Sequence, residues 1–297
     1  MKVLVTGASG LLGVELCQQL SAAGHEVWAV DDQSRGKVMP QCNHWLRLDL
    51  SDRDSYTQLP RDFEYIYHYA AINGTSNFYQ RPLAVLGNNF STDLLMFKFA
   101  AENHSLVKLV YAGSSEVVVG DPVSPVPEVT DISIENIHNP RWSYRLAKIC
   151  AENYLVNSEL PWVIIRHFNA YGSNSKAGHF VSDQIEKMRA GVFEIIGPEE
   201  TRSFCYVRDA MAATICCAER TCREVINVGT DQETLIMDAA NIIAAELGFS
   251  DPAWVLVPGL PGSTPTRRPD ITRLREIMPE FDPLSFAQGI QLTVAEY

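Results

Sequence analysis

Residues 3–13 read VLVTGASGLLG, an apolar run that breaks into glycine and then continues with helical spacing. Gly7, Gly10 and Gly13 therefore follow an expected strand and lie where the next helix opens. In that setting one glycine makes the tight turn, one lets a pyrophosphate approach the backbone, and one allows close packing of helix on strand. An ordinary glycine turn is the alternative, but the strand–turn–helix order favours a dinucleotide-binding turn.

Outward from this turn, apolar strands alternate with helix-like segments. Strands are expected at residues 2–7, 26–32, 44–50, 65–72, 108–113 and 162–172, and helices at residues 11–24, 92–103 and 143–157. This alternation predicts an α/β fold whose doubly wound parallel sheet is covered on both faces. Beyond residue 168 the alternation loosens. Residues 1–167 are predicted to bind the cofactor and residues 168–297 to form a smaller α/β substrate lobe, with some strands and helices returning to the first domain.

The composition argues against several classes of function. With 46% hydrophobic and 20% charged residues among 297, the chain is typical of a globular protein. Its formal net charge of -12 leaves no basic stripe to neutralise phosphates, so no nucleic-acid partner is expected. No run approaches the ~20 apolar residues of a membrane helix, and glycine comes too early for a signal peptide. Seven cysteines without a C-x-x-C pair, and seven histidines without metal-ligand spacing, favour a cytoplasmic protein without a metal.

Acidic residues end the second and third expected strands. Asp31 is placed to accept hydrogen bonds from the adenosine ribose, and its carboxylate would repel a 2′-phosphate, which favours NAD over NADP. Arg35 and Lys37 follow closely, and their positive charges keep NADP possible as the cofactor. Asp49 and Leu50 are placed to flank the adenine.

Two further segments carry groups that suit catalysis. Residues 110–122, VYAGSSEVVVGDP, pass from a buried strand into Ser114, Ser115 and Glu116, which would form either a polar strand exit or a catalytic edge. Tyr144 and Lys148 stand four residues apart and share one helix face. A lysine beside a tyrosine favours the phenolate and is expected to lower the tyrosine pKa. An ordinary amphipathic pair is the alternative.

Together these segments resemble the extended short-chain dehydrogenase/reductase family, specifically its nucleotide-sugar epimerases, dehydratases and decarboxylases. The resemblance runs through essentially the whole chain, in TGASGLLG, VDD, YHYAAI, YAGSSEV, YRLAK, RHFNAYG, TRSFCYVRD and RRPDI. It implies a Rossmann-type fold and a catalytic triad of Ser114, Tyr144 and Lys148. Ser114 would hold the sugar C4 oxygen while Tyr144 takes its proton and hydride passes to bound NAD. Lys148 would lower the tyrosine pKa and hold the nicotinamide ribose.

The resemblance also implies the binding residues. Asn169 and Arg202 match positions that contact the nucleotide-sugar diphosphate, and Arg267 and Ser115 are assigned to the same substrate. Surface salt bridges are the alternative for the two arginines. The NAD site is predicted to consist of Gly7, Ser9, Gly10, Leu11, Leu12, Gly13, Asp31, Asp32, Arg35, Asp49, Leu50, Tyr69, Ala70, Ala71, Asn89, Tyr144 and Lys148.

The chain departs from the family pattern at two places. The usual S-x-x-V-Y-G reads SSEVVVGD here, so the tyrosine is replaced and one residue is inserted before Gly120. The turn over the active site is therefore expected to differ. The segment GNNFSTDLL lacks the expected Gly-Thr pair, and Asn89 is a better match than Asn88 to the family's asparagine.

The step that follows oxidation at C4 stays open. Glu116 is placed to supply an acid–base group for dehydration, whereas 4-epimerases need no carboxylate there. Ser115 replaces the aspartate of dTDP-glucose dehydratases, and NPRWSY and RRPDI lean toward the decarboxylases. The main prediction is an NAD-dependent nucleotide-sugar epimerase or dehydratase. The alternatives are a UDP-glucuronate decarboxylase-like enzyme, an NAD(P)H-dependent reductase of a non-nucleotide substrate, and a non-catalytic NAD-binding regulator. The resemblance also implies a homodimer.

Overall fold

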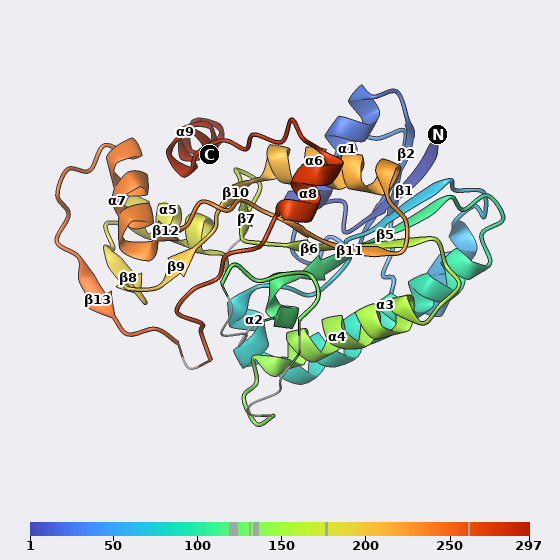
Figure 1. The fold of residues 1–297 in the computed structure, drawn as a ribbon, viewed down its shortest axis with the longest axis horizontal. Helices are drawn as coiled ribbons and strands as arrows, with labels where there is room; N and C mark the ends of the chain where they lie inside the picture. Colours follow the sequence, from blue (N-terminus) through green and yellow to red (C-terminus); the bar gives the residue numbers. More distant parts are fainter. Residues whose placement is uncertain (119–123, 131, 133–136, 176–177, 261) are drawn as a thin grey trace.

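A parallel sheet forms the centre of the molecule (Figure 1). The computed structural model describes residues 1–118, 124–130, 132, 137–175, 178–260 and 262–297. Within these residues the sheet has seven strands in the order β11-β6-β5-β4-β1-β2-β3, and all neighbours are parallel. The strands are β1 (Lys2–Thr6), β2 (Glu26–Asp31), β3 (His44–Arg47), β4 (Tyr65–His68), β5 (Lys108–Ser114), β6 (Trp162–His167) and β11 (Glu224–Val228).

Helices cover both faces of this sheet. On one face α1 (Leu11–Ala22) packs with α6 (Val207–Arg220), and on the other α3 (Pro82–Ala101) packs with α4 (Trp142–Val156). The alternation of side chains along a strand explains this arrangement. Val3 and Val5 join the core under α1 and α6, whereas Leu4 joins the core under α3 and α4. Shorter helical segments are η1 (Arg53–Gln58), α2 (Thr75–Gln80), η2 (Ser115–Val118) and α8 (Thr272–Ile277).

The second half of the chain forms a smaller lobe at the carboxyl ends of the strands. Three short strand pairs are described in it: β7 (Ala170–Tyr171) with β10 (Cys205–Tyr206), β9 (Thr201–Arg202) with β12 (Thr234–Leu235), and β8 (Glu194–Ile196) with β13 (Val255–Val257). Its helices are α5 (Phe180–Arg189), α7 (Ile236–Glu246) and α9 (Phe286–Glu296).

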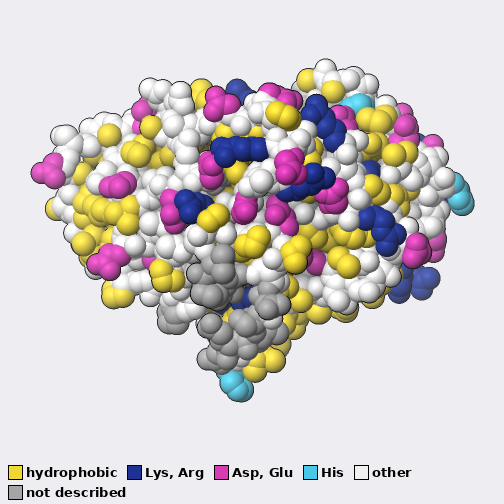
Figure 2. Space-filling view, viewed as in Figure 1, with side chains coloured by type: hydrophobic (Ala, Val, Ile, Leu, Met, Phe, Trp, Pro, Cys, Tyr) yellow, Lys and Arg dark blue, Asp and Glu magenta, His cyan; other side chains and the backbone are white. Residues whose placement is uncertain are grey.

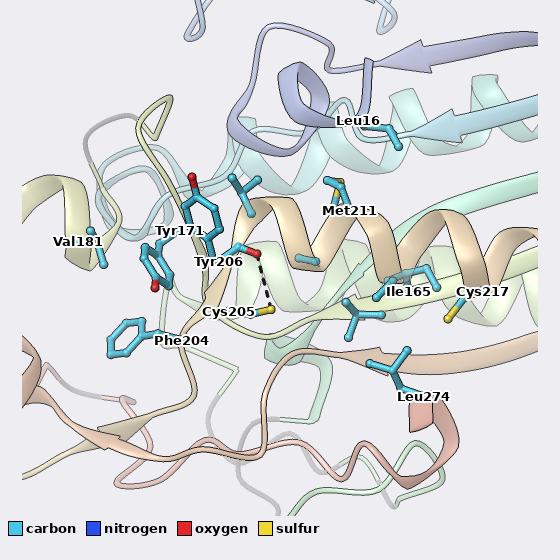
Figure 3. Close-up of a cluster of buried hydrophobic side chains, with 14 of the residues drawn as sticks. Leu16, Ile165, Tyr171, Val181, Phe204, Cys205, Tyr206, Met211, Cys217 and Leu274 are labelled. Carbon is cyan, nitrogen blue, oxygen red and sulfur yellow. Dashed lines mark hydrogen bonds between the residues drawn. The ribbon is translucent and has the colours of Figure 1, made fainter. Parts of the chain in front are cut away.

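One continuous apolar core joins this lobe to the sheet (Figure 3). Leu16 of α1 and Met211 of α6 belong to the same cluster as Tyr171 and Phe204 of the lobe. The ring of Phe204 also lies 4.7 Å from that of Phe286 on α9, centroid to centroid. Because protein interiors are close-packed, this shared core fixes the lobe against the edge of the sheet.

The predicted α/β fold with a doubly wound parallel sheet is confirmed. Strand β11 and helix α6 lie beyond residue 168 and complete the first sheet, since β11 pairs with β6. Helix α3 begins at Pro82 rather than at Thr92. Gly87, Asn88 and Asn89 weaken the helical signal there, but packing against α4 stabilises the helix.

The surface carries both signs of charge. On the face drawn in Figure 2, Lys and Arg side chains are interspersed with Asp and Glu side chains. Some of these charges form ion pairs: on α8, Arg273 pairs with Glu224 and Arg275 pairs with Asp231. None of the helices in the described ranges is long and apolar enough to cross a membrane.

Candidate active site

A cavity of about 650 Å³ opens at the carboxyl ends of the strands, where the second lobe faces the sheet. The strand register brings distant segments to this edge: Ser114 pairs with His167, and Thr6 with His68. Every predicted site residue except Ser9 lines the cavity. In open α/β sheets, ligands bind in the crevice outside the carboxyl ends of the strands.

The turn after β1 fits a dinucleotide. Gly7 has φ of 66°, and a Cβ there would lie 2.6 Å from the carbonyl carbon of Tyr69, so only glycine is accommodated. A Cβ on Gly13 would overlap the carbonyl oxygen of Gly7. The bare backbone at the amino end of α1 therefore leaves space for a pyrophosphate, whose negative charge the helix terminus favours.

Asp31 is held in place by main-chain amides. Its carboxylate accepts hydrogen bonds from the nitrogen of Ser9 at 3.0 Å and from that of Gln33 at 2.7 Å. Burial raises the pKa of Asp31, and these two hydrogen bonds oppose the shift. Ser9 does not line the cavity, but its main-chain nitrogen holds the carboxylate of Asp31, which does. Asp32 stabilises the following turn by accepting from the nitrogen of Ser34 at 2.8 Å.

Arg35 reaches the loop after β4. Its Nη1 donates to the carbonyl oxygen of Asn73 at 3.0 Å, and its charge acts on Tyr144 and His179. A contact between Arg35 and the 2′-phosphate of NADP, which the sequence left possible, would require this guanidinium to leave Asn73.

Asn89 supports the neighbouring wall of the cavity. Its Oδ1 accepts from the nitrogen of Ile72 at 2.7 Å, and its Nδ2 donates to the oxygen of Ile72 at 3.0 Å. Asn89 is buried whereas Asn88 is exposed, and both line the cavity. The two hydrogen bonds fix the loop that includes residues 69–71 of the predicted NAD site.

Ser114, Tyr144 and Lys148 meet at the cavity wall. Ser114 ends β5 and hydrogen bonds to Tyr144 on α4. Lys148 Nζ lies 5.8 Å from the centroid of the Tyr144 ring. It donates to the hydroxyl of Tyr111 at 3.0 Å and to the carbonyl oxygen of Ala112 at 2.8 Å. The three predicted catalytic residues are therefore brought together as expected.

The expected lowering of the tyrosine pKa is not found in this structure. Burial raises the pKa of Tyr144, and its hydrogen bond with Ser114 opposes only part of the shift. Burial also lowers the pKa of Lys148, against the charges of Asp93 and Glu152. Burial thus favours the uncharged form of both side chains, and the phenolate needs additional positive charge in the cavity.

Glu116 is an anion fixed between two arginines. It accepts from Arg141 Nη2 at 2.7 Å and from Arg267 Nη1 at 2.7 Å. Burial alone would raise the pKa of Glu116, but the charges of Arg267 and Arg141 lower it to about 2. Such a weak base is poorly suited to taking a proton near neutral pH. These contacts argue against the predicted acid–base role of Glu116, because they direct its carboxylate at the two guanidinium groups.

Arg202 and Asn169 belong to the same end of the cavity. Arg202 forms an ion pair with Glu200 and donates to Ser263 Oγ at 2.9 Å. Burial lowers the pKa of Arg202 to about 10, and the charge of Arg267 adds to this shift. Asn169 donates from Nδ2 to the carbonyl oxygen of Ser203 at 3.2 Å. Arg202 and Arg267 are both largely buried, so neither forms a surface salt bridge.

Positive charge is in excess at this end. Within the part of the chain that the structure describes, Arg141, Arg202 and Arg267 form ion pairs with two carboxylates, those of Glu116 and Glu200. Nε and Nη2 of Arg267 are buried and have no hydrogen-bond partner in the described part of the chain. Buried donors without partners are costly, so this end of the cavity is suited to an anion with several acceptor oxygens.

Phe78, His167 and Arg141 are among the cavity residues that were not predicted from the sequence. Phe78 of α2 stacks on Tyr144 with centroids 4.8 Å apart and planes 18° apart. His167 Nε2 lies 3.0 Å from the Tyr69 hydroxyl, and burial lowers the pKa of His167 to about 3. Arg141 is the third. Of these three, only Arg141 has a feature in the sequence that points to the site, because it stands three residues before Tyr144, at the start of the same helix.

Two further predictions concern what lies around this site. Among the described residues, no group of three or more His, Cys, Asp or Glu side chains could hold a metal ion. The departure from the family pattern after Glu116 falls partly on residues 119–123, which lie outside the described residues.

Comparison with known proteins identifies relatives along the whole chain. A model described as the NAD dependent epimerase/dehydratase family matches residues 3–229. UDP-N-acetyl-alpha-D-glucosaminuronate decarboxylase of Bacillus cytotoxicus is 29% identical over 322 residues, which cover 99% of this chain and 96% of that protein. UDP-glucose 4-epimerase of Thermotoga maritima, solved with UDP-glucose, has a TM-score of 0.88 at 25% identity and covers 100% of this chain and 98% of its own. UDP-N-acetylglucosamine 4-epimerase of Methanobrevibacter ruminantium, solved with UDP-N-acetylmuramic acid, has a TM-score of 0.86 at 27% identity. The match covers 99% of this chain and 97% of that protein's chain.

Proposed function

The chain belongs to the NAD-dependent epimerase/dehydratase family, and on that premise we propose that it oxidises a nucleoside-diphosphate sugar acid at C4 and then decarboxylates it. The class predicted from the sequence, an NAD-dependent nucleotide-sugar enzyme, agrees with this family. The choice of an acidic sugar rests on one observation, the excess of guanidinium groups around Glu116.

The oxidation step uses the triad. Ser114 holds the C4 hydroxyl, and Tyr144 as phenolate accepts its proton while the ammonium of Lys148 stabilises the negative charge. Bound NAD supplies the hydride acceptor for the hydrogen on C4. Asp31 and the glycine turn at residues 7–13 hold the adenosine ribose and the pyrophosphate of that cofactor.

The second step follows from the chemistry of a C4 ketone. A carboxylate on C6 is then a β-keto acid, and loss of carbon dioxide moves the electron pair of the C5–C6 bond into an enolate at O4. A proton taken from water adds at C5 and restores the ketone. Tyr144 then returns its proton to O4, and the bound cofactor would return the hydride to C4. Arg141 and Arg267, held by Glu116, orient the C6 carboxylate, and Arg202 binds the diphosphate.

A panel of nucleotide sugars tests this proposal. The purified protein is incubated with UDP-glucuronate, UDP-N-acetylglucosaminuronate and UDP-glucose, and carbon dioxide and products are measured by mass spectrometry. We expect carbon dioxide and a pentose product from an acidic sugar, and no turnover of UDP-glucose. Epimerisation of an acidic sugar without release of carbon dioxide would contradict the second step. Turnover of the neutral sugar alone would contradict the acidic substrate.

We also propose that the enzyme is a cytoplasmic homodimer. All seven cysteines are free, and Cys150 and Cys222 are exposed, which supports a reducing compartment. Helices α3 and α4 pack side by side and expose Leu83, Phe90 and Tyr154. Exposed apolar side chains on these two packed helices support pairing of two copies through them.

A further inference from the structure

A chain of buried polar groups begins beside the glycine turn. Thr6 Oγ1 accepts hydrogen bonds from the nitrogens of Tyr69 and Ala70, both at 3.1 Å, and lies 2.8 Å from His68 Nδ1. Because two amides already donate to this oxygen, the hydroxyl hydrogen is directed at His68 Nδ1. That leaves Nε2 of His68 as the ring nitrogen that carries a hydrogen and donates.

Asp93 of α3 connects this chain to Lys148. Its Oδ1 lies 3.1 Å from His68 Nε2, and its Oδ2 accepts from the Tyr111 hydroxyl at 2.8 Å. Tyr111 in turn accepts from Lys148 Nζ at 3.0 Å. Asp93 is 1% exposed and Lys148 is 2% exposed. A carboxylate and an ammonium are therefore joined through a single hydroxyl group in the interior.

The two groups compensate each other's burial. An isolated buried charge is strongly unfavourable unless an opposite charge and hydrogen bonds stabilise it. Burial lowers the pKa of Lys148, and the charge of Asp93 is the largest opposing effect, followed by that of Glu152. Glu152 is already paired with Arg166 at 2.7 Å, so Asp93 is the carboxylate that remains for Lys148. The other titratable groups around the ammonium are Tyr144 on its own helix, Tyr111 on β5, His68 on β4 and His167 on β6.

The same contacts set the direction of the lysine. An ammonium has three N–H donors, and Lys148 uses two of them to donate to the hydroxyl of Tyr111 and to the carbonyl oxygen of Ala112. Lys148 lines the cavity, so the third donor is left for a group bound there. Asp93 lies in the segment GNNFSTDLL, where the chain departs from the pattern of its family.

We propose that Asp93 and Tyr111 are positioning residues that keep Lys148 protonated and aim its remaining N–H into the cavity. The inference rests on the proposed function for the use of Lys148 in oxidation. The coupling of Asp93 to Lys148 is a property of the fold and can be measured without a substrate.

The test is a titration of Lys148 by NMR in protein labelled with ¹³C at lysine Cε, with the signal assigned through Lys148→Arg. Asp93→Asn removes the charge and keeps the shape, so the pKa of Lys148 should fall by about two units, as expected for opposite charges ~6 Å apart at the effective dielectric of a protein, roughly 20. Tyr111→Phe removes the connecting hydroxyl and should lower the same pKa by less. Asn103→Ala is the control, because it removes buried hydrogen bonds to Phe63 just beyond α3 and should leave Lys148 unchanged.

An unchanged Lys148 titration in folded Asp93→Asn overturns the inference. If that variant does not fold, an unchanged titration in Tyr111→Phe does so. In turnover assays the whole pH profile of kcat/KM should move to lower pH in Asp93→Asn, because the charge of Asp93 also raises the pKa of Tyr144 beyond the effect of burial. Damage to structure alone would lower the profile without moving it. A shifted lysine titration without turnover of any nucleotide sugar refutes the proposed function and leaves this inference standing.

Discussion

Replacing Glu116 by glutamine removes the negative charge between two buried guanidinium groups and keeps the shape of the side chain. The pKa of Glu116 lies at about 2, below its ordinary value of 4.5. At about 1.4 kcal/mol per unit, this difference corresponds to roughly 3 kcal/mol of stabilisation. The side chain is 11% exposed, so solvent screens the pairs only slightly. We expect Glu116→Gln to lower the free energy of unfolding by about 3 kcal/mol at pH 7, similar to the usual cost of breaking a buried ion pair.

The pH dependence of this loss is specific to a carboxylate with a lowered pKa. Its stabilisation is fully present above the unfolded-state pKa of 4.5 and disappears as the pH falls toward about 2. The difference in unfolding free energy between wild type and Glu116→Gln should therefore be constant from pH 7 to about 5 and shrink below that. Urea unfolding followed by circular dichroism at several pH values measures it.

Glu224→Gln is the matched control. Glu224 also pairs with an arginine through two hydrogen bonds, from Arg273 at 2.8 and 3.0 Å, but this pair is partly exposed. Surface pairs contribute about 1 kcal/mol or less, so this variant should be nearly as stable as wild type. If Glu116→Gln loses no more than the control, or if its loss does not shrink below pH 4.5, Glu116 is not held by the two arginines as described.

Three further outcomes are expected. Tyr144→Phe should leave folding and NAD binding nearly intact and lower turnover by at least ~10²-fold, the usual effect of losing a general acid–base group; unchanged turnover in a steady-state assay would rule out the triad. Asp31→Ala should weaken NAD binding and reduce the preference for NAD over NADP, because the carboxylate that repels a 2′-phosphate is gone. The assignment of Asp31 is wrong if titration shows that wild type binds NADP more tightly than NAD. Leu83→Glu, on the exposed side of α3, should convert dimers to monomers in light scattering after gel filtration; a variant that stays dimeric would exclude pairing through Leu83.

The fold and the triad could be predicted because their signals are local. Apolar runs of strand length, the glycine turn at residues 7–13 and the i, i+4 spacing of Tyr144 and Lys148 each lie within a short segment. Parallel pairing places the end of β5 at the edge of the sheet where ligands bind, whereas the assignment of Ser114 as the partner of Tyr144 came from the resemblance to the family. The early start of α3 was missed because tertiary packing overrides weak local propensity there.

The electrostatics of the site could not be predicted from local pattern. The role of Glu116 depends on Arg141 and on Arg267, which stand 25 and 151 residues away in the chain. The raised pKa of Tyr144 depends chiefly on burial, which no spacing rule describes. Asp93 looks like an ordinary polar residue on a helix until the fold places it beneath Lys148.

Single-turnover kinetics with UDP-glucuronate carrying deuterium at C4 tests the central claim, oxidation at C4 followed by loss of the carboxylate. We predict a transient absorbance of reduced cofactor, slowed by the deuterium and followed by carbon dioxide, with neither signal in Tyr144→Phe. Release of carbon dioxide without transient absorbance and without an isotope effect would contradict the account.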